Sequence, residues 1–288
     1  MSHAGAQVLP TRPYRFCGEK NMLPALSSLS CTFSSRSQRI RVLSEAWAAE
    51  HLFCPQCGGG LSRFPNNSPV ADFFCAKCKE EYELKSSSSI RCARIPGGAY
   101  QAMIRRLLDD NNPNFIMLRY DKASLAVREV FVVPRYYFVP GLIRKRAPLA
   151  ATARRAGWVG CTIELDKVPQ AGRIALVAGG KTRSKADVRN AWLATGKVRL
   201  GQEKGRGWLL AVVRCIESLH SMEFCLADLY AQEERFKRLH PENRNIKAKL
   251  RQQLQILRNQ GCLQFIGPGR YRLSAPEGAG ILGRLAPQ

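Results

Sequence analysis

Apolar and polar residues recur with two different periods along this chain. Residues 37–53 place apolar side chains at near-helical intervals, which predicts an amphipathic helix, and a second helix is expected over residues 97–111. Residues 114–120 and 127–137 are rich in β-branched and aromatic side chains, so they predict strands. Helices and strands in this order predict a mixed sheet with helices on its faces, an α/β core.

The pattern changes in the second half of the chain. Residues 140–160 are basic and contain several Pro and Gly, which is typical of a surface loop or arm. Residues 207–219, 223–236 and 242–261 each predict a helix, and residues 262–273 predict two short strands around a Gly-Pro-Gly turn. Three helices followed by a hairpin predict a winged helix. The alternative is a small helical bundle with a β tail.

Two further stretches lack these periods. Residues 1–36 are rich in Pro, Ser and Gly, so we expect a poorly ordered leader, with Met22 as an alternative start. Near residues 179–206 the composition turns to Gly, Lys and Arg, which indicates a boundary between domains. A chain of 288 residues is long enough for a larger and a smaller domain.

The charge of the chain indicates its partner. The sequence has 45 Lys and Arg against 22 Asp and Glu, a formal net charge of +23. Such an excess points first to a polyanion such as nucleic acid, and the alternative is charge that serves solubility alone. No run approaches the roughly 20 apolar residues of a membrane span, and the first residues do not resemble a secretory signal. We therefore expect a cytoplasmic protein without a membrane partner.

The cysteines predict a metal site. The chain has 11 of them, and this odd number fits reduced thiols better than a disulfide framework. Two closely spaced pairs stand out: Cys54, Cys57, Cys75 and Cys78. The spacing C-x2-C-x17-C-x2-C lets two tight turns offer four thiolates to one structural Zn²⁺, and the alternative is four buried free thiols. His51 is close in sequence, but four thiolates already complete the coordination.

Two carboxylates and a lysine belong to the same hairpin. If residues 81–85 form a strand, alternation places Glu83 and Lys85 on one face, about 6.7 Å apart along the strand. Glu81 shares that face. Asp72 then lies beside Glu83 when the two arms of the zinc-bound turn pair as neighbouring strands.

This arrangement predicts chemistry at a phosphodiester. Neighbouring carboxylates repel each other as anions unless a cation lies between them. Mg²⁺ prefers one or two carboxylates, waters and a substrate phosphate oxygen, so Asp72 and Glu83 predict a Mg²⁺ site. Lys85 can orient or deprotonate the attacking water and stabilise the charge that develops on phosphorus. The alternative is a solvated strand on which acidic and basic residues merely alternate.

The motifs around these residues resemble a known family. Residues 69–72 (PVAD) and 83–85 (ELK) resemble the PD-(D/E)-x-K nuclease motif, with two residues rather than none between Pro and Asp. The wider segments ADFFCAKCKEEYELKS, DNNPNF, PLAATARRAGWVGC and IKAKLRQQLQILR resemble the DpnI-type methyl-directed restriction endonucleases. The resemblance extends from about residue 37 to residue 273.

The resemblance implies a type II endonuclease that hydrolyses both strands of duplex DNA at GATC sites whose adenine carries an N6-methyl group. It implies that Asp72, Glu83 and Lys85 are catalytic, with Mg²⁺ as the catalytic and Zn²⁺ as the structural cofactor. We expect a monomer with four parts: a leader (1–36), a zinc-containing PD-(D/E)xK nuclease domain (37–200), a winged-helix DNA-binding domain (206–274) and a tail (275–288).

Two regions are candidates for reading the methyl group. In the nuclease domain, Trp158 can offer an apolar face to a methyl while Arg154 and Arg155 bind phosphate or guanine. The alternative for Trp158 is a place in the core. In the third C-terminal helix the core positions are expected to be Ile246, Leu250, Leu254 and Leu257. The outward side chains are then Arg244, Lys247, Arg251, Gln252 and Gln255, which can bind bases or phosphates or form a solvated basic face.

Two other functions remain open at this stage. A non-enzymatic zinc and winged-helix regulator would bind DNA with Asp72 merely capping a turn. An RNA nuclease fits the charge, but a winged helix prefers a groove wide enough for a helix.

Overall fold

The structure, a computed structural model, describes residues 23–26, 35–65, 71–89, 93–108, 112–199 and 203–274. Most of the expected leader and all of the expected tail lie outside these ranges. Residues 23–26 belong to the expected leader, and they pack on the protein. The Trp47 indole donates a hydrogen bond to the Pro24 carbonyl at 2.8 Å, and Leu26 is buried.

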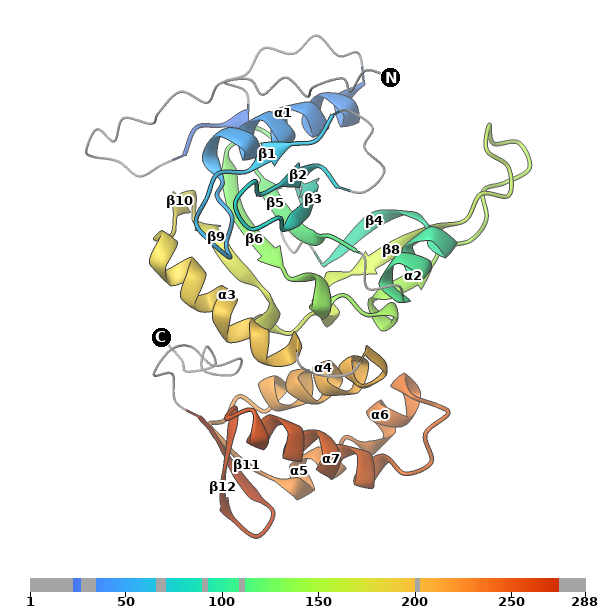
Figure 1. Ribbon diagram of the computed structural model, residues 1–288. Helices are drawn as coiled ribbons and strands as arrows, with labels where there is room; N and C mark the ends of the chain where they lie inside the picture. The colour runs from blue at the N-terminus through green and yellow to red at the C-terminus, as the bar shows by residue number, and fades with distance from the viewer. Residues whose placement is uncertain are drawn as a thin grey trace, which may run out of the picture.

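A seven-stranded sheet forms the centre of the first part of the chain (Figure 1). In spatial order its strands are β1 (Ser62–Arg63), β2 (Phe73–Phe74), β3 (Glu81–Ser87), β5 (Asn114–Tyr120), β6 (Val127–Val133), β9 (Ile174–Ala178) and β10 (Lys181–Thr182). The β3–β5 pair is parallel and the other pairs are antiparallel. The expected mixed sheet is confirmed.

A smaller sheet lies beside the parallel pair. The connection from β3 to β5 contains β4 (Arg94–Ala99) and α2 (Tyr100–Leu108), as a parallel crossover requires. Strand β4 pairs with β8 (Gly160–Glu164), which pairs with β7 (Ile143–Lys145). Between β7 and β8, residues 146–159 extend away from the rest of the molecule (Figure 1), and we call them the arm. The expected surface segment, residues 140–160, therefore contains a 3-10 turn (Pro140–Leu142) and a strand (β7) that the sequence did not predict.

The large sheet separates two hydrophobic clusters. Helices α1 (Arg36–His51) and α3 (Lys185–Arg199) pack with the sheet in one of them, the α1-side cluster. Alternation along β5 shows the division, since Ile116 and Leu118 belong to the α1-side cluster whereas Phe115 and Met117 belong to the other. That second cluster also contains side chains of α2, the small sheet and α4 (Glu203–Ser218), and we call it the α4-side cluster.

The C-terminal part forms the expected winged helix (Figure 1). Its helices after α4 are α5 (Leu226–Tyr230), α6 (Glu233–Leu239) and α7 (Ile246–Asn259). Its sheet has the order β11 (Glu223–Cys225), β13 (Arg270–Leu273) and β12 (Leu263–Gly267).

The single helix expected over residues 223–236 is wrong. Residues Glu223–Cys225 pair with β13 and form an extended strand instead. Cys225 then caps α5, because its backbone N–H donates to the Asp228 carboxylate at 2.7 Å. The strand expected over residues 127–137 ends early for a similar local reason. Pro134 has no N–H to donate to a neighbouring strand, and the chain continues as the 3-10 turn η2 (Arg135–Tyr137).

Three more 3-10 turns follow η2 in the first part of the chain: η3 (Pro140–Leu142), η4 (Leu165–Lys167) and η5 (Gln170–Gly172). Of these, η5 is hydrogen-bonded to the second part. The Glu217 carboxylate of α4 accepts hydrogen bonds from the Gln170 and Ala171 N–H groups of η5, each at 3.1 Å. The α4-side cluster spans this junction. The division between residues 200 and 206 stays a prediction, because residues 200–202 lie outside the described ranges.

Candidate functional site

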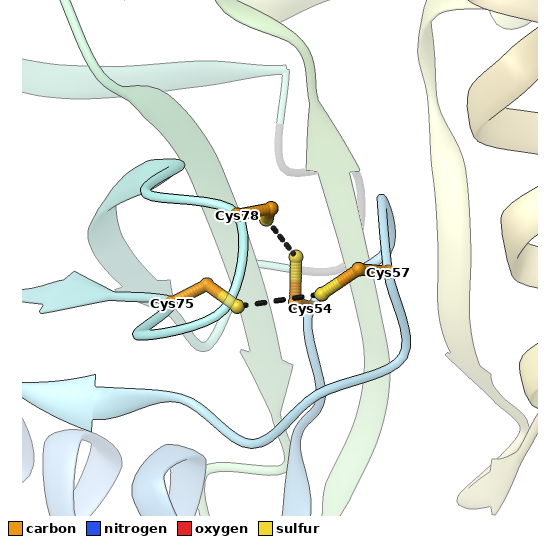
Figure 2. A group of neighbouring side chains, drawn as sticks. All are labelled: Cys54, Cys57, Cys75 and Cys78. Atoms are coloured by element: carbon orange, nitrogen blue, oxygen red, sulfur yellow. Dashed lines mark hydrogen bonds between the residues drawn. The ribbon is translucent and has the colours of Figure 1, made fainter.

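The four cysteines of the two pairs meet in space. Their sulfur atoms all lie within 4.8 Å of one another. Figure 2 shows the four side chains gathered around a common centre. Four sulfurs around Zn²⁺, each about 2.3 Å from it, would be separated by about 3.8 Å. The Cys54–Cys78 and Cys57–Cys75 sulfur pairs are at 3.4 Å. Their donor set and spacing fit Zn²⁺.

Both cysteine pairs belong to turns of the same design. In the first turn the Gly58 N–H donates to the Cys54 carbonyl at 2.8 Å, and in the second the Lys79 N–H donates to the Cys75 carbonyl at 2.8 Å. The fifth residue of each turn has a positive φ, +73° at Gly58 and +64° at Lys79. Two equivalent turns facing each other present two thiolates each, which leaves no open position for a substrate.

The thiols of the cluster have different pKa values. Burial raises the pKa of Cys54, although the Tyr82 hydroxyl bonded to its sulfur opposes this. Burial also acts to raise the pKa of Cys75, but hydrogen bonds from the Cys78 N–H and the Cys57 thiol outweigh it and lower the value to about 7. The cluster therefore already contains hydrogen-bond donors that favour thiolates, the form that binds zinc.

The carboxylates lie next to this cluster on paired strands. The Asp72 N–H donates to the Tyr82 carbonyl at 3.0 Å, and the Asp72 carboxylate accepts a hydrogen bond from the Leu84 N–H at 2.8 Å. Phe73 pairs with Tyr82, so these bonds hold Asp72 beside Glu83, one residue before the paired part of β2. The prediction that the two arms pair as strands is confirmed.

Glu83 and Lys85 share one face of β3. Tyr82, which precedes Glu83, and Leu84, which lies between Glu83 and Lys85, are buried in the α1-side cluster, as alternation requires. The Lys85 ammonium lies 2.5 Å from a Glu83 carboxylate oxygen, and both side chains remain partly exposed. The three residues that the sequence placed together do lie together.

The electrostatics of Asp72 reflect this crowding. Burial raises the pKa of Asp72, and the charges of Glu45 and Glu83 act in the same direction. The Leu84 N–H and the Lys85 charge oppose the rise. A bound cation would relieve the repulsion between the carboxylates, so the oxygen ligands present here fit Mg²⁺.

Sequence reasoning missed Glu45. This residue of α1 is only 6% exposed, and its carboxylate accepts hydrogen bonds from Arg41 at 2.7 Å and Arg63 at 2.8 Å. Its charge contributes to the raised pKa of Asp72. The available signal was an acidic residue beside Leu43 and Trp47 on the apolar face of the predicted helix.

The arm is a hairpin that carries Trp158. The Arg146 N–H donates to the Gly160 carbonyl, and the Leu149 N–H donates to the Trp158 carbonyl, each at 3.0 Å. The Trp158 ring is half-buried and lies on the backbone of Gly160, where an added Cβ would be 2.7 Å from the ring. The Arg155 guanidinium lies 4.9 Å from the ring centroid. Trp158 is therefore seated on the arm and is not part of either core cluster.

The base of the arm is close to β3. Burial raises the pKa of Cys161 in β8, with the Lys85, Glu83 and Arg146 charges as further influences. One buried thiol thus lies within electrostatic range of both the β3 pair and Arg146. Arg154 and Arg155, near the tip, are exposed.

Helix α7 is the helix whose outward face the sequence predicted to bind DNA. Its apolar face is confirmed, since the four expected core residues are buried, with Gln253 in addition. The predicted outward residues are all exposed: Arg244, Lys247, Arg251, Gln252 and Gln255. Arg244 was expected in the helix but lies before it, because α7 begins at Ile246 after the N-cap Asn245.

Several of these outward side chains have partners within the domain. Arg251 donates to the Tyr230 hydroxyl at 2.8 Å, and Lys247 lies 5.3 Å from the centroid of the Tyr230 ring. Gln252 accepts a hydrogen bond from Lys249 at 2.7 Å. A surface hollow of about 380 Å³ at the start of the helix is lined by Asn243, Asn245, Ala248, Lys249 and Gln252. Of these, only Gln252 was predicted from the sequence.

No helix in the described part of the chain is both long and apolar enough to cross a membrane. Comparison with known families gives two matches. Residues 204–273 match the Dam-replacing HTH domain, which agrees with the winged helix and suggests DNA binding. Residues 25–200 match the Dam-replacing family, whose members are of the DpnI type. The chain therefore belongs to the Dam-replacing family, and this membership implies a restriction-type nuclease.

Proposed function

We propose that the protein is a Mg²⁺-dependent type II endonuclease that cuts both strands of duplex DNA at GATC sites containing N6-methyladenine. The observation that carries this proposal is the group formed by Asp72, Glu83 and Lys85 on two paired strands of a family member. Residues 37–200 would form the nuclease domain and residues 206–274 the DNA-binding winged helix. Zn²⁺ in the four-cysteine site would have a structural role.

Each of the three side chains has a role that its position supports. Asp72 and Glu83 would hold Mg²⁺, which supplies charge stabilisation at the scissile phosphate when bound. Lys85 orients the attacking water and stabilises the negative charge that develops on phosphorus. Its ion pair with Glu83 fixes the ammonium at the surface of the sheet, where a DNA backbone can reach it.

The methyl group calls for more than one contact. Burial of one methyl-sized group contributes about 0.8 kcal/mol, and a pocket distinguishes one carbon by roughly 1 to 3 kcal/mol. A palindromic GATC site carries a methyl on each strand. Two readers that each contact both methyls, at about 1 kcal/mol per contact, give about 4 kcal/mol, nearly a thousandfold preference.

Trp158 is the proposed reader of the nuclease domain. Its ring lies on the arm, whose base is within electrostatic range of Lys85 and Glu83 through Cys161. Arg154 and Arg155 beside it are exposed cations that can bind phosphate or guanine. A methylated base held by the arm would therefore lie near the phosphate to be cut.

Helix α7 is the proposed second reader. Gln252 and Gln255 can bond adenine in the major groove. Lys247 and Arg251 of the helix, and Arg244 just before it, can bond guanine or phosphate. The surface hollow adds Ala248, a small apolar side chain beside Gln252 that offers a contact for a methyl group.

The test is digestion of one plasmid, prepared with and without adenine methylation. We expect the protein with Mg²⁺ to cut the methylated plasmid at GATC and to leave the unmethylated one intact. Replacing Mg²⁺ by Ca²⁺ should abolish cutting but preserve binding, and it leaves the zinc site loaded, unlike a chelator. Tight binding of methylated plasmid without any cutting would favour the regulator instead, and degradation of RNA in place of duplex DNA would favour an RNA nuclease.

A further inference from the structure

Tyr82 lies where the four-cysteine site meets the β2–β3 hairpin, which holds the residues proposed to be catalytic. It is fully buried in the middle of the α1-side cluster. Its hydroxyl lies 3.1 Å from the Cys54 sulfur. A thiolate can only accept, so the hydroxyl is the donor of this hydrogen bond when the cluster binds a metal.

The backbone of Tyr82 is hydrogen-bonded directly to Asp72. The Tyr82 carbonyl accepts the hydrogen bond from the Asp72 N–H at 3.0 Å. Tyr82 is also the covalent neighbour of Glu83, and it is registered opposite Phe73, the neighbour of Asp72. Any shift of Tyr82 along or across β3 therefore moves both carboxylates relative to each other.

We propose that Tyr82 is a positioning residue that couples the four-cysteine metal site to the two catalytic carboxylates. Its hydroxyl binds the Cys54 thiolate, and its main chain holds Asp72 beside Glu83. The inference needs zinc in the cluster, but it does not need the nuclease activity proposed above.

This role follows from the chemistry of a buried tyrosine. A phenylalanine would fill the same apolar volume, so packing alone does not require the hydroxyl. A hydrogen bond from outside the ligand set to a metal-bound group typically changes metal affinity 10- to 100-fold. The hydroxyl is thus expected to act on the metal rather than on the packing.

The first experiment compares Tyr82→Phe with the unchanged protein by zinc release to a chromogenic chelator. We expect release to be about 10- to 100-fold faster in the variant. Loaded with Co²⁺ in place of zinc, the variant should also show shifted thiolate-to-metal charge-transfer bands, because one sulfur has lost its donor. Identical release rates and identical Co²⁺ spectra would overturn the proposal.

The matched control is Tyr120→Phe. Tyr120 is a mostly buried tyrosine of the neighbouring strand β5 in the same cluster. Among the described hydrogen bonds, none joins its hydroxyl to a cysteine. The control should leave zinc release and the Co²⁺ spectrum unchanged. An equal change in both variants would mean that the cluster responds to any lost hydroxyl, which contradicts a specific role for Tyr82.

The second experiment tests the coupling to the carboxylates by amide hydrogen exchange. In Tyr82→Phe, the Asp72 and Leu84 N–H groups should exchange at least about tenfold faster, because the hairpin is less firmly fixed. Unchanged exchange of these two amides, together with faster zinc release, would overturn the coupling. Neither readout involves DNA cleavage. Failure of the nuclease proposal would appear as absent cutting in the unchanged protein and would leave both results interpretable.

Discussion

The two sides of the large sheet differ in what they support. The α1-side cluster contains Tyr82, Cys54 and Cys75, and so it supports the four-cysteine site and the buried face of β3. The α4-side cluster joins the small sheet, from which the arm extends, to the winged helix that carries α7. One side of the sheet thus supports the four-cysteine site, and the other carries both proposed readers.

The side chains of Glu83 and Lys85, which are proposed to be catalytic, project toward the α4 side of the sheet. Glu83 and Lys85 are registered beside Phe115 and Met117 of β5, and these two residues pack in the α4-side cluster. β3 is therefore held by packing on the α1 side, while its Glu83 and Lys85 side chains face the α4 side, where both proposed readers lie. Substitutions on the two sides should separate these contributions.

The largest expected effect is loss of the metal. Cys57→Ser removes one of four thiolates, and structural zinc contributes on the order of ten kcal/mol to local folding. We expect a melting temperature at least about 10 °C lower, with zinc absent from the purified protein. The helices of the winged helix should persist, because they pack in the other cluster. Zinc content, thermal melting and circular dichroism measure these outcomes.

Cys225→Ser is the matched control for that variant. Cys225 is a half-buried free thiol that caps α5, and serine is a favourable residue at such a position. Zinc content and melting temperature should both stay close to those of the unchanged protein. A full zinc complement in Cys57→Ser would contradict the four-thiolate site.

The next largest effect concerns the carboxylates. Asp72→Asn keeps the side-chain shape and an oxygen that can accept the Leu84 N–H, but it removes the charge. Cutting of methylated plasmid should fall about a thousandfold or more, equivalent to about 4 kcal/mol of transition-state stabilisation. Duplex binding should change less than about threefold.

Asp121→Asn provides the comparison for Asp72. Asp121 is an aspartate whose carboxylate also accepts main-chain hydrogen bonds, from Ala123 and Ser124 in an exposed turn. The Asp121→Asn variant should cut methylated plasmid at the rate of the unchanged protein. If Asp72→Asn lost binding and cutting in equal measure, its role would be structural rather than catalytic.

The local parts of the site could be predicted from the sequence. The spacing of the cysteines, the alternation in EYELK and the apolar face of α7 are all set by residues near one another in the chain. Each was confirmed because a turn, a strand or a helix fixes such positions by its own geometry. The pairing of Asp72 with β3 followed from the metal, which brings the two arms together.

The remaining parts depend on contacts between distant residues. Glu223–Cys225 is a strand only because β13, about 45 residues later, supplies its partner. The roles of Glu45, Tyr82 and Glu217 likewise depend on the partner atoms that folding brings to them. A single sequence contains no periodic signal for such pairs, so they could be found only in the folded structure.

A smaller effect is expected from a substitution of Gly160, on which the Trp158 ring packs. In Gly160→Ala the new Cβ would lie 2.7 Å from the Trp158 ring, so the ring must move. The ratio of cutting rates on methylated and unmethylated plasmid should fall about tenfold, within the roughly 1 to 3 kcal/mol that one carbon provides. Trp158→Ala should lower the same ratio more than it lowers the melting temperature.

Gly98→Ala is the control for the arm. An added Cβ at Gly98 has no atom within 4 Å, and Gly98 belongs to β4 of the same small sheet. Its cutting ratio should be unchanged. A normal ratio in Gly160→Ala, combined with a changed near-ultraviolet circular dichroism signal from the displaced ring, would exclude Trp158 as the methyl reader.

The smallest effect tests the junction between the first part of the chain and the winged helix. Glu217→Ala leaves the Gln170 and Ala171 N–H groups without their carboxylate, and because this site is partly exposed, water can replace part of the interaction. We expect a loss of about 1 kcal/mol in the free energy of unfolding.

Burial raises the pKa of Glu217, although the two N–H groups and the Arg173 charge oppose the rise. A carboxyl with a raised pKa in the folded state favours folding most at a pH below its unfolded value, and this contribution is lost as the pH rises through the folded value. The stability difference between the unchanged protein and Glu217→Ala should therefore be larger near pH 4 than near pH 7, as measured by denaturant unfolding at both. A difference that grows with pH would mean that the carboxylate is stabilised in its charged form at the junction, contrary to the raised pKa.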